Sequence, residues 1–348
     1  MEKFHDESGR VDVRSLSLAG IQELVAGMGK ERFRALQVWK WIWQRKIADF
    51  SEMTNISKGF RGAMAERAYL LWLELARMER SEDGTRKLAW RLEDGRVVES
   101  VLIADEERLT LCVSSQVGCA MGCAFCLTAD MGLVRNLKPA EIALQVAQAE
   151  GLLDEGERIS NIVFMGMGEP LANLENVLIA IEILLDENAL NYSHRKITVS
   201  TSGLVPKLRE LADRSPVNLA ISLNGTTDEQ RTALMPVNKA YPLAALLETC
   251  RTIPLPAGKR ITFEYVMIAG FNDSLEDARR LLKLMRPLKA KINLLPYNEN
   301  PERDLERPSE EVVKAFQNHI IQGGIQCSVR TSRGRDISAA CGQLGKGL

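Results

Sequence analysis

The stretch CAMGCAFC, residues 119–126, holds three cysteines with the spacing C-x3-C-x2-C: Cys119, Cys123 and Cys126. It follows a predicted β-strand, LTLCVSS at 109–115, and precedes a segment that we expect to be helical. Structural zinc sites and ordinary iron–sulfur clusters take four protein ligands, and zinc sites favour C-x2-C pairs with a longer spacer. The spacing therefore favours an iron–sulfur cluster with three protein ligands, and it leaves a zinc site and a chance grouping as alternatives.

Short β-rich runs and helical patterns alternate from about residue 110 onward. The predicted strands are 109–115, 161–168, 196–202, 218–224, 261–270, 291–298 and 325–332. The predicted helices are 138–153, 174–189, 243–250, 275–288 and 310–320. This βα repetition predicts a parallel sheet, either in a barrel or in a doubly wound arrangement. In both arrangements the active site gathers at the C-terminal ends of the strands. Polar or glycine-rich groups fall there, at 166–169, 200–202, 222–224 and Asn298.

The N-terminal part has a different pattern. Residues 1–75 are predicted to form a small helical accessory domain, because apolar residues recur at helical spacing. The segment ERFRALQVWKWIWQR (31–45) interleaves three tryptophans with basic residues. It is interpreted as an amphipathic helix with a Trp-rich core, or alternatively as a module that touches RNA. Residues 76–108 carry Asp-Gly turns between alternating apolar runs and predict a short β-hairpin extension. The core then spans 109–348.

Composition narrows the class of protein. The 348 residues are 45% apolar and carry a formal net charge of -1, which excludes a uniformly basic nucleic-acid protein but not a local basic patch. The polar N-terminus is not a signal peptide, and no apolar run has the length of a membrane span. Seven cysteines, an odd number in a chain this long, argue against a secreted disulfide scaffold. We therefore expect a cytoplasmic protein without a membrane partner.

Several motifs together resemble one family. The cysteine spacing is the signature of the radical S-adenosylmethionine (SAM) superfamily. The motifs are CVSSQVGCAMGCAFCLTADMGLVRNL (112–137), FMGMGEPLAN (164–173), VSTSGLVP (199–206), INLLPYN (292–298) and RTSRGRDISAACGQL (330–344). They closely resemble the RlmN family, which methylates carbon 2 of adenine in 23S ribosomal RNA and in tRNA. The resemblance runs from about Glu31 to Leu344 and implies an α/β fold, a partial (β/α)6 radical SAM barrel.

The resemblance also implies cofactors and their contacts. Cys119, Cys123 and Cys126 match the ligands of a [4Fe–4S] cluster, whose fourth iron is left open for SAM. The residues that match SAM contacts are Gly168, Glu169, Ser200, Ser222, Leu223, Asn224 and Asn298. The family usually has Ser-Leu-His where this chain has Ser222–Leu223–Asn224. Because Asn lacks a titratable ring, we expect contacts there from the backbone and Ser222 rather than from the Asn224 side chain.

Three further residues match catalytic positions of the family. Cys341 matches the cysteine that accepts a methyl group from one SAM. A second SAM, cleaved at the cluster, gives a radical that takes hydrogen from this methyl group, and the carbon then adds to adenine carbon 2. Glu99 matches the acceptor of the ring proton. Cys112 matches the thiol that attacks the Cys341 sulfur and releases the product, leaving a disulfide for cellular thiols to reduce. From the residues alone, a structural role is favoured for Cys341 and left open for Cys112, and Cys250 and Cys327 are expected to be structural.

Alternatives and partners complete the expectations. Relatives that methylate carbon 8 share the cysteine loop and AACGQL, although FMGMGEPL and SSQVGC look more like the carbon-2 group. A non-enzymatic iron–sulfur or zinc RNA-binding protein is the other alternative. The expected partners are 23S rRNA, tRNA and an electron donor such as flavodoxin or ferredoxin, and a monomer is expected. Candidate phosphate contacts are the N-terminal basic segment and Arg135, Arg330, Arg333 and Arg335.

Overall fold

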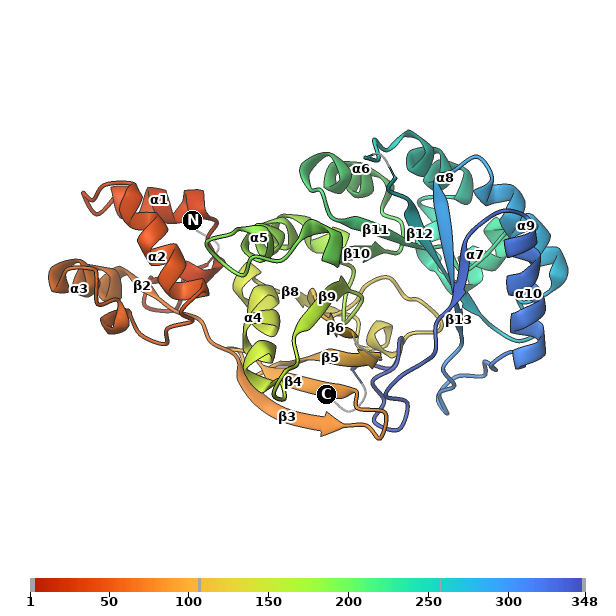
Figure 1. The fold of residues 1–348 in the computed structure, drawn as a ribbon, viewed down its shortest axis with the longest axis horizontal. Helices are drawn as coiled ribbons and strands as arrows, with labels where there is room; N and C mark the ends of the chain where they lie inside the picture. Colours follow the sequence, from red (N-terminus) through yellow and green to blue (C-terminus); the bar gives the residue numbers. More distant parts are fainter. Residues whose placement is uncertain (1–3, 106–107, 257, 346–348) are drawn as a thin grey trace.

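The computed structural model describes residues 4–105, 108–256 and 258–345. A small helical module at the N-terminus projects from one side of a large curved sheet (Figure 1). It contains α1 (Leu18–Ala26), α2 (Phe33–Trp43) and α3 (Lys58–Arg67), joined by a parallel pair of two-residue strands, β1 (Val11–Asp12) and β2 (Ala68–Tyr69). Trp39 and Trp43 are fully buried and meet edge to face, 6.3 Å between ring centres. The Trp-rich core expected for this helix is thereby confirmed for both residues.

Seven parallel strands form the main body. Along the sheet they are β6 (Arg108–Cys112), β9 (Ile159–Phe164), β10 (Ile197–Thr201), β11 (Asn218–Ser222), β12 (Ile261–Met267), β13 (Ala290–Pro296) and β14 (Cys327–Val329). The helices that connect them are α4 (Pro139–Ala149), α5 (Leu174–Leu185), α6 (Val205–Arg214), α7 (Asp228–Leu234), α8 (Leu243–Thr252), α9 (Leu275–Met285) and α10 (Glu310–Gln322). The first six strands are each followed by helix, so the predicted (β/α)6 pattern is confirmed, with β14 as a short final strand.

The helices lie on the outer face of the curved sheet, and the sheet does not close (Figure 1). Local sequence explains several helix starts. Ser274 and Asp277 form a capping box at α9, Ser309 accepts the Val312 N–H at α10, and Pro139 occupies the first turn of α4. Among the described residues, no helix has the length and apolar character needed to cross a membrane.

An antiparallel extension continues the sheet beyond β6. It consists of β3 (Glu74–Arg80), β4 (Arg86–Arg91) and β5 (Val97–Asp105), in the order β6-β5-β4-β3. The Asp-Gly turns lie at its two reversals, where Gly84 and Gly95 have φ of 85° and 79°. The extension therefore contains two turns and three strands, one strand more than a single hairpin.

The segment after the cysteine loop differs from the prediction. A single 3-10 turn (Leu127–Ala129) follows Cys126, and the chain then forms β8 (Leu133–Asn136), which pairs with β7 (Gln116–Gly118). The ribbon was not predicted because its strands are too short for a periodic signal and depend on each other for pairing. It closes tightly: a Cβ on Gly118 would lie 1.8 Å from the Gly132 carbonyl oxygen, so only glycine fits.

Candidate active site

The cysteine loop and the C-terminal ends of the parallel strands line one cavity. Its lining includes Cys119, Cys123, Cys126, Gly168, Glu169, Ser200, Ser202, Ser222, Asn224, Glu264 and Cys341. An adjoining cavity is lined by Cys112, Cys126, Asn298, Arg330 and Cys341, among others. Of the residues predicted to contact cluster or SAM, all but Leu223 line one of these two cavities. The Leu223 side chain is fully buried in the core, so any contact there must come from its backbone.

The cysteine loop is fixed by its backbone. The Cys119 N–H donates to the Gly132 carbonyl at 2.9 Å, and the Ala124 N–H donates to the Leu234 carbonyl at 2.9 Å. Burial raises the pKa of all three thiols, that of Cys119 to about 11. A cationic group bound among them would favour the thiolate forms. Among the described residues, no group of three or more His, Cys, Asp or Glu side chains lies close enough together to hold a single metal ion.

The residues that line the two cavities include buried polar atoms that a bound ligand could satisfy. Within the described part of the chain, Ser202 Oγ, Glu264 Oε2 and Asn298 Oδ1 are buried without a hydrogen-bond partner. Such groups are costly unless a ligand or water satisfies them. Three thiols at one end and unpaired polar atoms along the walls suit a soft metal cluster beside a polar small molecule. The residues present therefore fit a cluster with bound SAM.

Gly168 and Glu169 shape the end of β9. Gly168 has φ of 98°, and a Cβ there would lie 2.4 Å from the Gln116 Cβ, so a side chain cannot be accommodated. The Glu169 carboxylate accepts the backbone N–H groups of Leu171 at 3.0 Å and Ser202 at 2.7 Å. Burial raises the Glu169 pKa and these two hydrogen bonds oppose the rise. Glu169 thus ties β9 to β10, and an ammonium group in the cavity would stabilise its ionised form.

The Asn224 side chain forms contacts within the protein. It has a left-handed backbone with φ of 56°, its Oδ1 accepts the Val266 N–H at 2.8 Å, and its Nδ2 lies 3.2 Å from the Met235 sulfur. The side chain therefore joins β11 to β12. The expectation that SAM is contacted there by the backbone and Ser222, rather than by the Asn224 side chain, stays a prediction.

Cys112 and Cys341 come together from distant segments. Cys112 is buried on β6, whereas Cys341 lies in the C-terminal segment and stays exposed on one side. Both are free thiols and both line the second cavity. Burial, and next the nearby Cys341, raise the Cys112 pKa to about 12. Close packing also raises the Cys341 pKa, and the Arg330 guanidinium opposes that rise. Cys250 and Cys327 are buried elsewhere, in α8 and β14.

Glu99 lies beneath the C-terminal segment. It is 1% exposed on β5, and its Oε2 accepts the Gly345 N–H at 2.8 Å. Its Oε1 lies 3.6 Å from Lys87 Nζ. Glu99 is not among the described residues that line the two cavities. Its predicted role as a proton acceptor thus stays a prediction.

Glu264 is a site residue that sequence reasoning missed. It lies on β12, accepts a hydrogen bond from Asn293 Nδ2 at 3.0 Å and borders the first cavity. Burial raises its pKa, while Arg330 opposes the rise. The available signal was a charged residue in the middle of the apolar strand ITFEYVM, because buried charges are retained only with a partner or a task.

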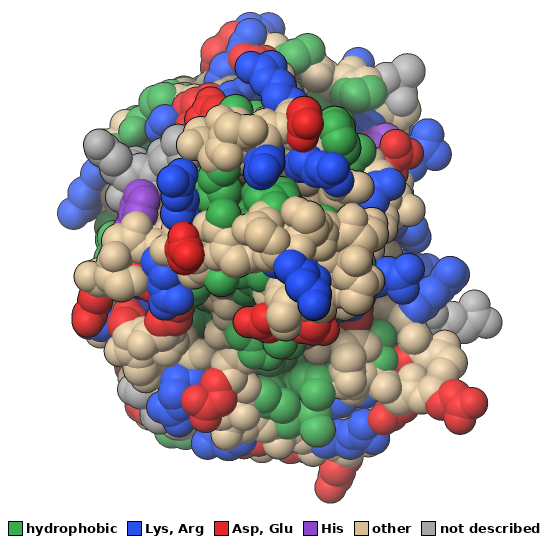
Figure 2. Space-filling view, turned by 90° about the vertical axis from the view of Figure 1, so that its left-hand side faces the viewer, with side chains coloured by type: hydrophobic (Ala, Val, Ile, Leu, Met, Phe, Trp, Pro, Cys, Tyr) green, Lys and Arg blue, Asp and Glu red, His purple; other side chains and the backbone are tan. Residues whose placement is uncertain are grey.

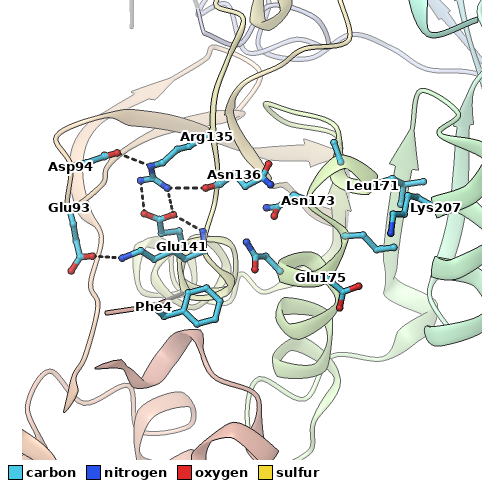
Figure 3. Close-up of a pocket in the computed structure, with 14 residues that line it drawn as sticks. Phe4, Glu93, Asp94, Arg135, Asn136, Glu141, Leu171, Asn173, Glu175 and Lys207 are labelled. Carbon is cyan, nitrogen blue, oxygen red and sulfur yellow. Dashed lines mark hydrogen bonds and ion pairs between the residues drawn. The ribbon is translucent and has the colours of Figure 1, made fainter. Parts of the chain in front are cut away.

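Arg135 is engaged by carboxylates. Its guanidinium donates to Asp94 at 2.7 Å and to both Glu141 oxygens at 2.8 and 2.9 Å (Figure 3). These residues border a hollow of about 600 Å³, which lies away from the three cysteines. Because the carboxylates of Asp94 and Glu141 already pair with the Arg135 guanidinium, the predicted contact between Arg135 and an RNA phosphate is disfavoured. Among the described residues, Arg333 and Arg335 form longer ion pairs, at 3.5 Å to Asp105 and 4.0 Å to Glu299.

Comparison with known proteins identifies the family. Residues 113–282 match the Radical SAM superfamily, and residues 11–70 match the Ribosomal RNA large subunit methyltransferase N-terminal domain. The dual-specificity RNA methyltransferase RlmN of Anaeromyxobacter sp. (strain Fw109-5) is 52% identical over 341 residues, covering 96% of this chain and 90% of the relative. The chain belongs to the RlmN family. The RlmN of Syntrophotalea carbinolica is 51% identical over 345 residues, covering 99% of this chain and 92% of that relative.

A solved structure agrees with this membership. A radical SAM methyltransferase from Sphaerobacter thermophilus superposes with a TM-score of 0.89 and 43% identity, covering 96% of this chain and 99% of the other. As a member of the RlmN family, the protein is a radical SAM methyltransferase that uses a [4Fe–4S] cluster and SAM. The alternative of a non-enzymatic RNA-binding protein is set aside by this membership.

Proposed function

We propose that the protein methylates carbon 2 of adenine in 23S rRNA and in tRNA, with Cys341 carrying the methyl group to the base. The position of Cys341 supports this proposal most directly. It lines the cavity of the cysteine loop and also the adjoining cavity with Cys112. A thiol on the border of both cavities can accept a methyl group on one side and deliver it on the other.

The chain's residues divide the work as follows. When bound, the cluster and SAM supply the methyl group and the radical chemistry that activates it. Cys341 attacks the methyl carbon as a thiolate, and the nearby Arg330 favours that ionised form. After the carbon has joined the base, Cys112 attacks the Cys341 sulfur. A sulfur–sulfur bond forms, the carbon–sulfur bond breaks with its electron pair passing to the methylene carbon, and that carbon takes up a proton as the methylated base leaves.

The relay predicts a methylated cysteine in the resting enzyme. Protein incubated with SAM is expected to carry one added methyl group on the peptide that contains Cys341, because that thiol is the first acceptor. RNA added together with a reductant and further SAM should remove the methyl-derived carbon from that peptide, because the methyl group must first lose a hydrogen atom to the SAM-derived radical. Mass spectrometry of digested protein checks both steps, with the buried Cys327 as an internal control that should gain nothing. Absence of the methyl group on Cys341 while the RNA becomes methylated would contradict the relay.

The N-terminal module is the proposed RNA-holding surface. Lys30, Arg32, Lys40, Arg45 and Lys58 are exposed on it. Figure 2 faces this end of the molecule and shows Lys and Arg side chains distributed over its surface. Phosphate contacts from such side chains position RNA without reading its sequence. The module's match to an rRNA methyltransferase N-terminal domain supports this assignment.

Charge reversal on this module should weaken RNA binding. The double variant Lys40→Glu, Arg45→Glu is expected to reduce affinity for tRNA. The slope of the logarithm of the binding constant against the logarithm of the salt concentration should become shallower by roughly 0.7–0.9 for each phosphate contact that is lost. Filter binding across a salt series checks both quantities. The matched control is Arg251→Glu, an exposed charge on α8 that pairs with Glu248. Unchanged binding by the double variant would show that RNA is held elsewhere.

A further inference from the structure

The segment that carries Cys341 is fastened to the antiparallel extension. The Gly334 N–H donates to Asp83 at 2.9 Å, and Asp336 accepts from Ser81 Oγ at 2.6 Å. Lys87 Nζ donates to the Ile337 carbonyl at 2.7 Å. These bonds join residues more than 240 positions apart in the sequence, and they do not involve the parallel barrel. The extension thus acts as a platform for the C-terminal segment.

Lys87 and Glu99 form the centre of this platform. They lie on β4 and β5, on the same face of the sheet, because Glu99 pairs with Ala89, two residues from Lys87. Both are buried, with 5% and 1% exposure. Lys87 Nζ lies 3.0 Å from Glu79 and 3.6 Å from Glu99. A buried lysine is costly unless it is paired and hydrogen-bonded, and here its remaining bond goes to the C-terminal segment.

The two attachment points flank Cys341 symmetrically. Lys87 holds the carbonyl of Ile337, and Glu99 holds the N–H of Gly345, so each attachment is four residues from Cys341. Between them, the segment touches the cysteine loop, where the Leu127 N–H donates to the Gly342 carbonyl at 2.8 Å. Asn298 Nδ2 also donates to the Cys341 carbonyl at 3.2 Å. The span that can move around Cys341 is therefore short.

We propose that Lys87 is a positioning residue that fixes Cys341 at the border of the two cavities. It does so by bonding the Ile337 carbonyl directly and by orienting the Glu99 carboxylate that receives Gly345. The catalytic meaning of this position rests on the proposed function, whereas the attachment itself does not. Lys87 is not among the described residues that line the two cavities, so it acts on the position of Cys341 through its contacts with the C-terminal segment and with Glu99.

The test compares Lys87→Met, which removes the charge and the donor, with Lys87→Arg, which keeps both. In the full-length protein, Lys87→Met should speed amide hydrogen exchange across residues 334–345 by about tenfold or more, the effect of losing one hydrogen bond to a charged group. Iodoacetamide should also label Cys341 faster, measured against Cys327 in the same sample. Lys87→Arg should keep both the exchange rate and the labelling rate close to those of the wild-type protein. Neither readout requires cluster, SAM or RNA.

The matched control is Arg91→Met on the same strand, whose exposed guanidinium pairs with Glu74 and has no hydrogen bond or ion pair to the described residues of the C-terminal segment. It should leave both rates unchanged. If Lys87→Met fails to fold, as judged by circular dichroism, Lys87→Ala replaces it, because alanine also lacks both the charge and the donor. Wild-type exchange and labelling rates in the folded variant would overturn the proposal. A wild-type protein that never methylates Cys341 would instead overturn the proposed function and leave the positioning result standing.

Discussion

Replacing Cys341 with alanine is expected to abolish RNA methylation while leaving the cluster site intact. The variant lacks the nucleophile that accepts the methyl group, so transfer should fall by a factor on the order of 10⁴ or more, as for other lost nucleophiles. The measurement is transfer of a labelled methyl group from SAM to RNA. Visible absorbance of the reconstituted cluster should match wild type, because the three ligating thiols are unchanged.

Cys327→Ala is the matched control for this variant. Cys327 is buried in β14 and is not among the described residues that line the two cavities, so its loss should affect stability more than transfer. Methyl transfer that survives in Cys341→Ala would refute the relay. It would mean that the group passes to the base without a cysteine carrier.

Replacing Cys112 with alanine is expected to leave RNA covalently attached to the protein. Without Cys112, the thiols of the described residues that share the two cavities with Cys341 are Cys119, Cys123 and Cys126, and these would be held by the cluster rather than free to attack the Cys341 sulfur. Cys112 is only 6% exposed, so its position is poorly accessible to thiols from solution. A denaturing gel should therefore show an RNA–protein adduct as the main product, in place of free methylated RNA.

Two control variants test where the RNA is attached and which thiol releases it. The double variant Cys112→Ala, Cys341→Ala should form none, because the attachment point is gone. Cys250→Ala, which changes a cysteine buried in α8, should release product as wild type does. Efficient turnover by Cys112→Ala would contradict the resolving role of Cys112.

Much of the barrel was predictable because its signals are local. The apolar run of β12 and the helical periodicity of α9 and α10 each extend over seven or more residues. The cysteine loop was predictable from the spacing of its three cysteines. Helices α6 and α7 were not predicted, since α6 begins inside the motif 199–206 and α7 has only seven residues. The β7–β8 ribbon depends on pairing between segments that lack any periodic pattern of their own.

The arrangement of the site was predictable only where strand ends define it. Ser200 and Ser222 lie in the last two residues of β10 and β11, Gly168 follows β9, and parallel strands bring their ends together. The burial of Glu99 and Lys87 could not be predicted in this way, because a charged residue in a strand of alternating pattern is expected to face solvent. Their burial comes from the C-terminal segment, which packs over them from more than 240 residues away. No local pattern encodes that contact.

The most direct test of the central claim is nucleoside analysis of RNA modified by this enzyme. Unmodified 23S rRNA and tRNA are incubated with the reconstituted protein, SAM and a reductant, then digested and separated by liquid chromatography with mass spectrometry. We predict that 2-methyladenosine appears and that Cys341→Ala produces none. Detection of 8-methyladenosine instead, or of no methylated adenosine from an enzyme with an intact cluster, would contradict the account.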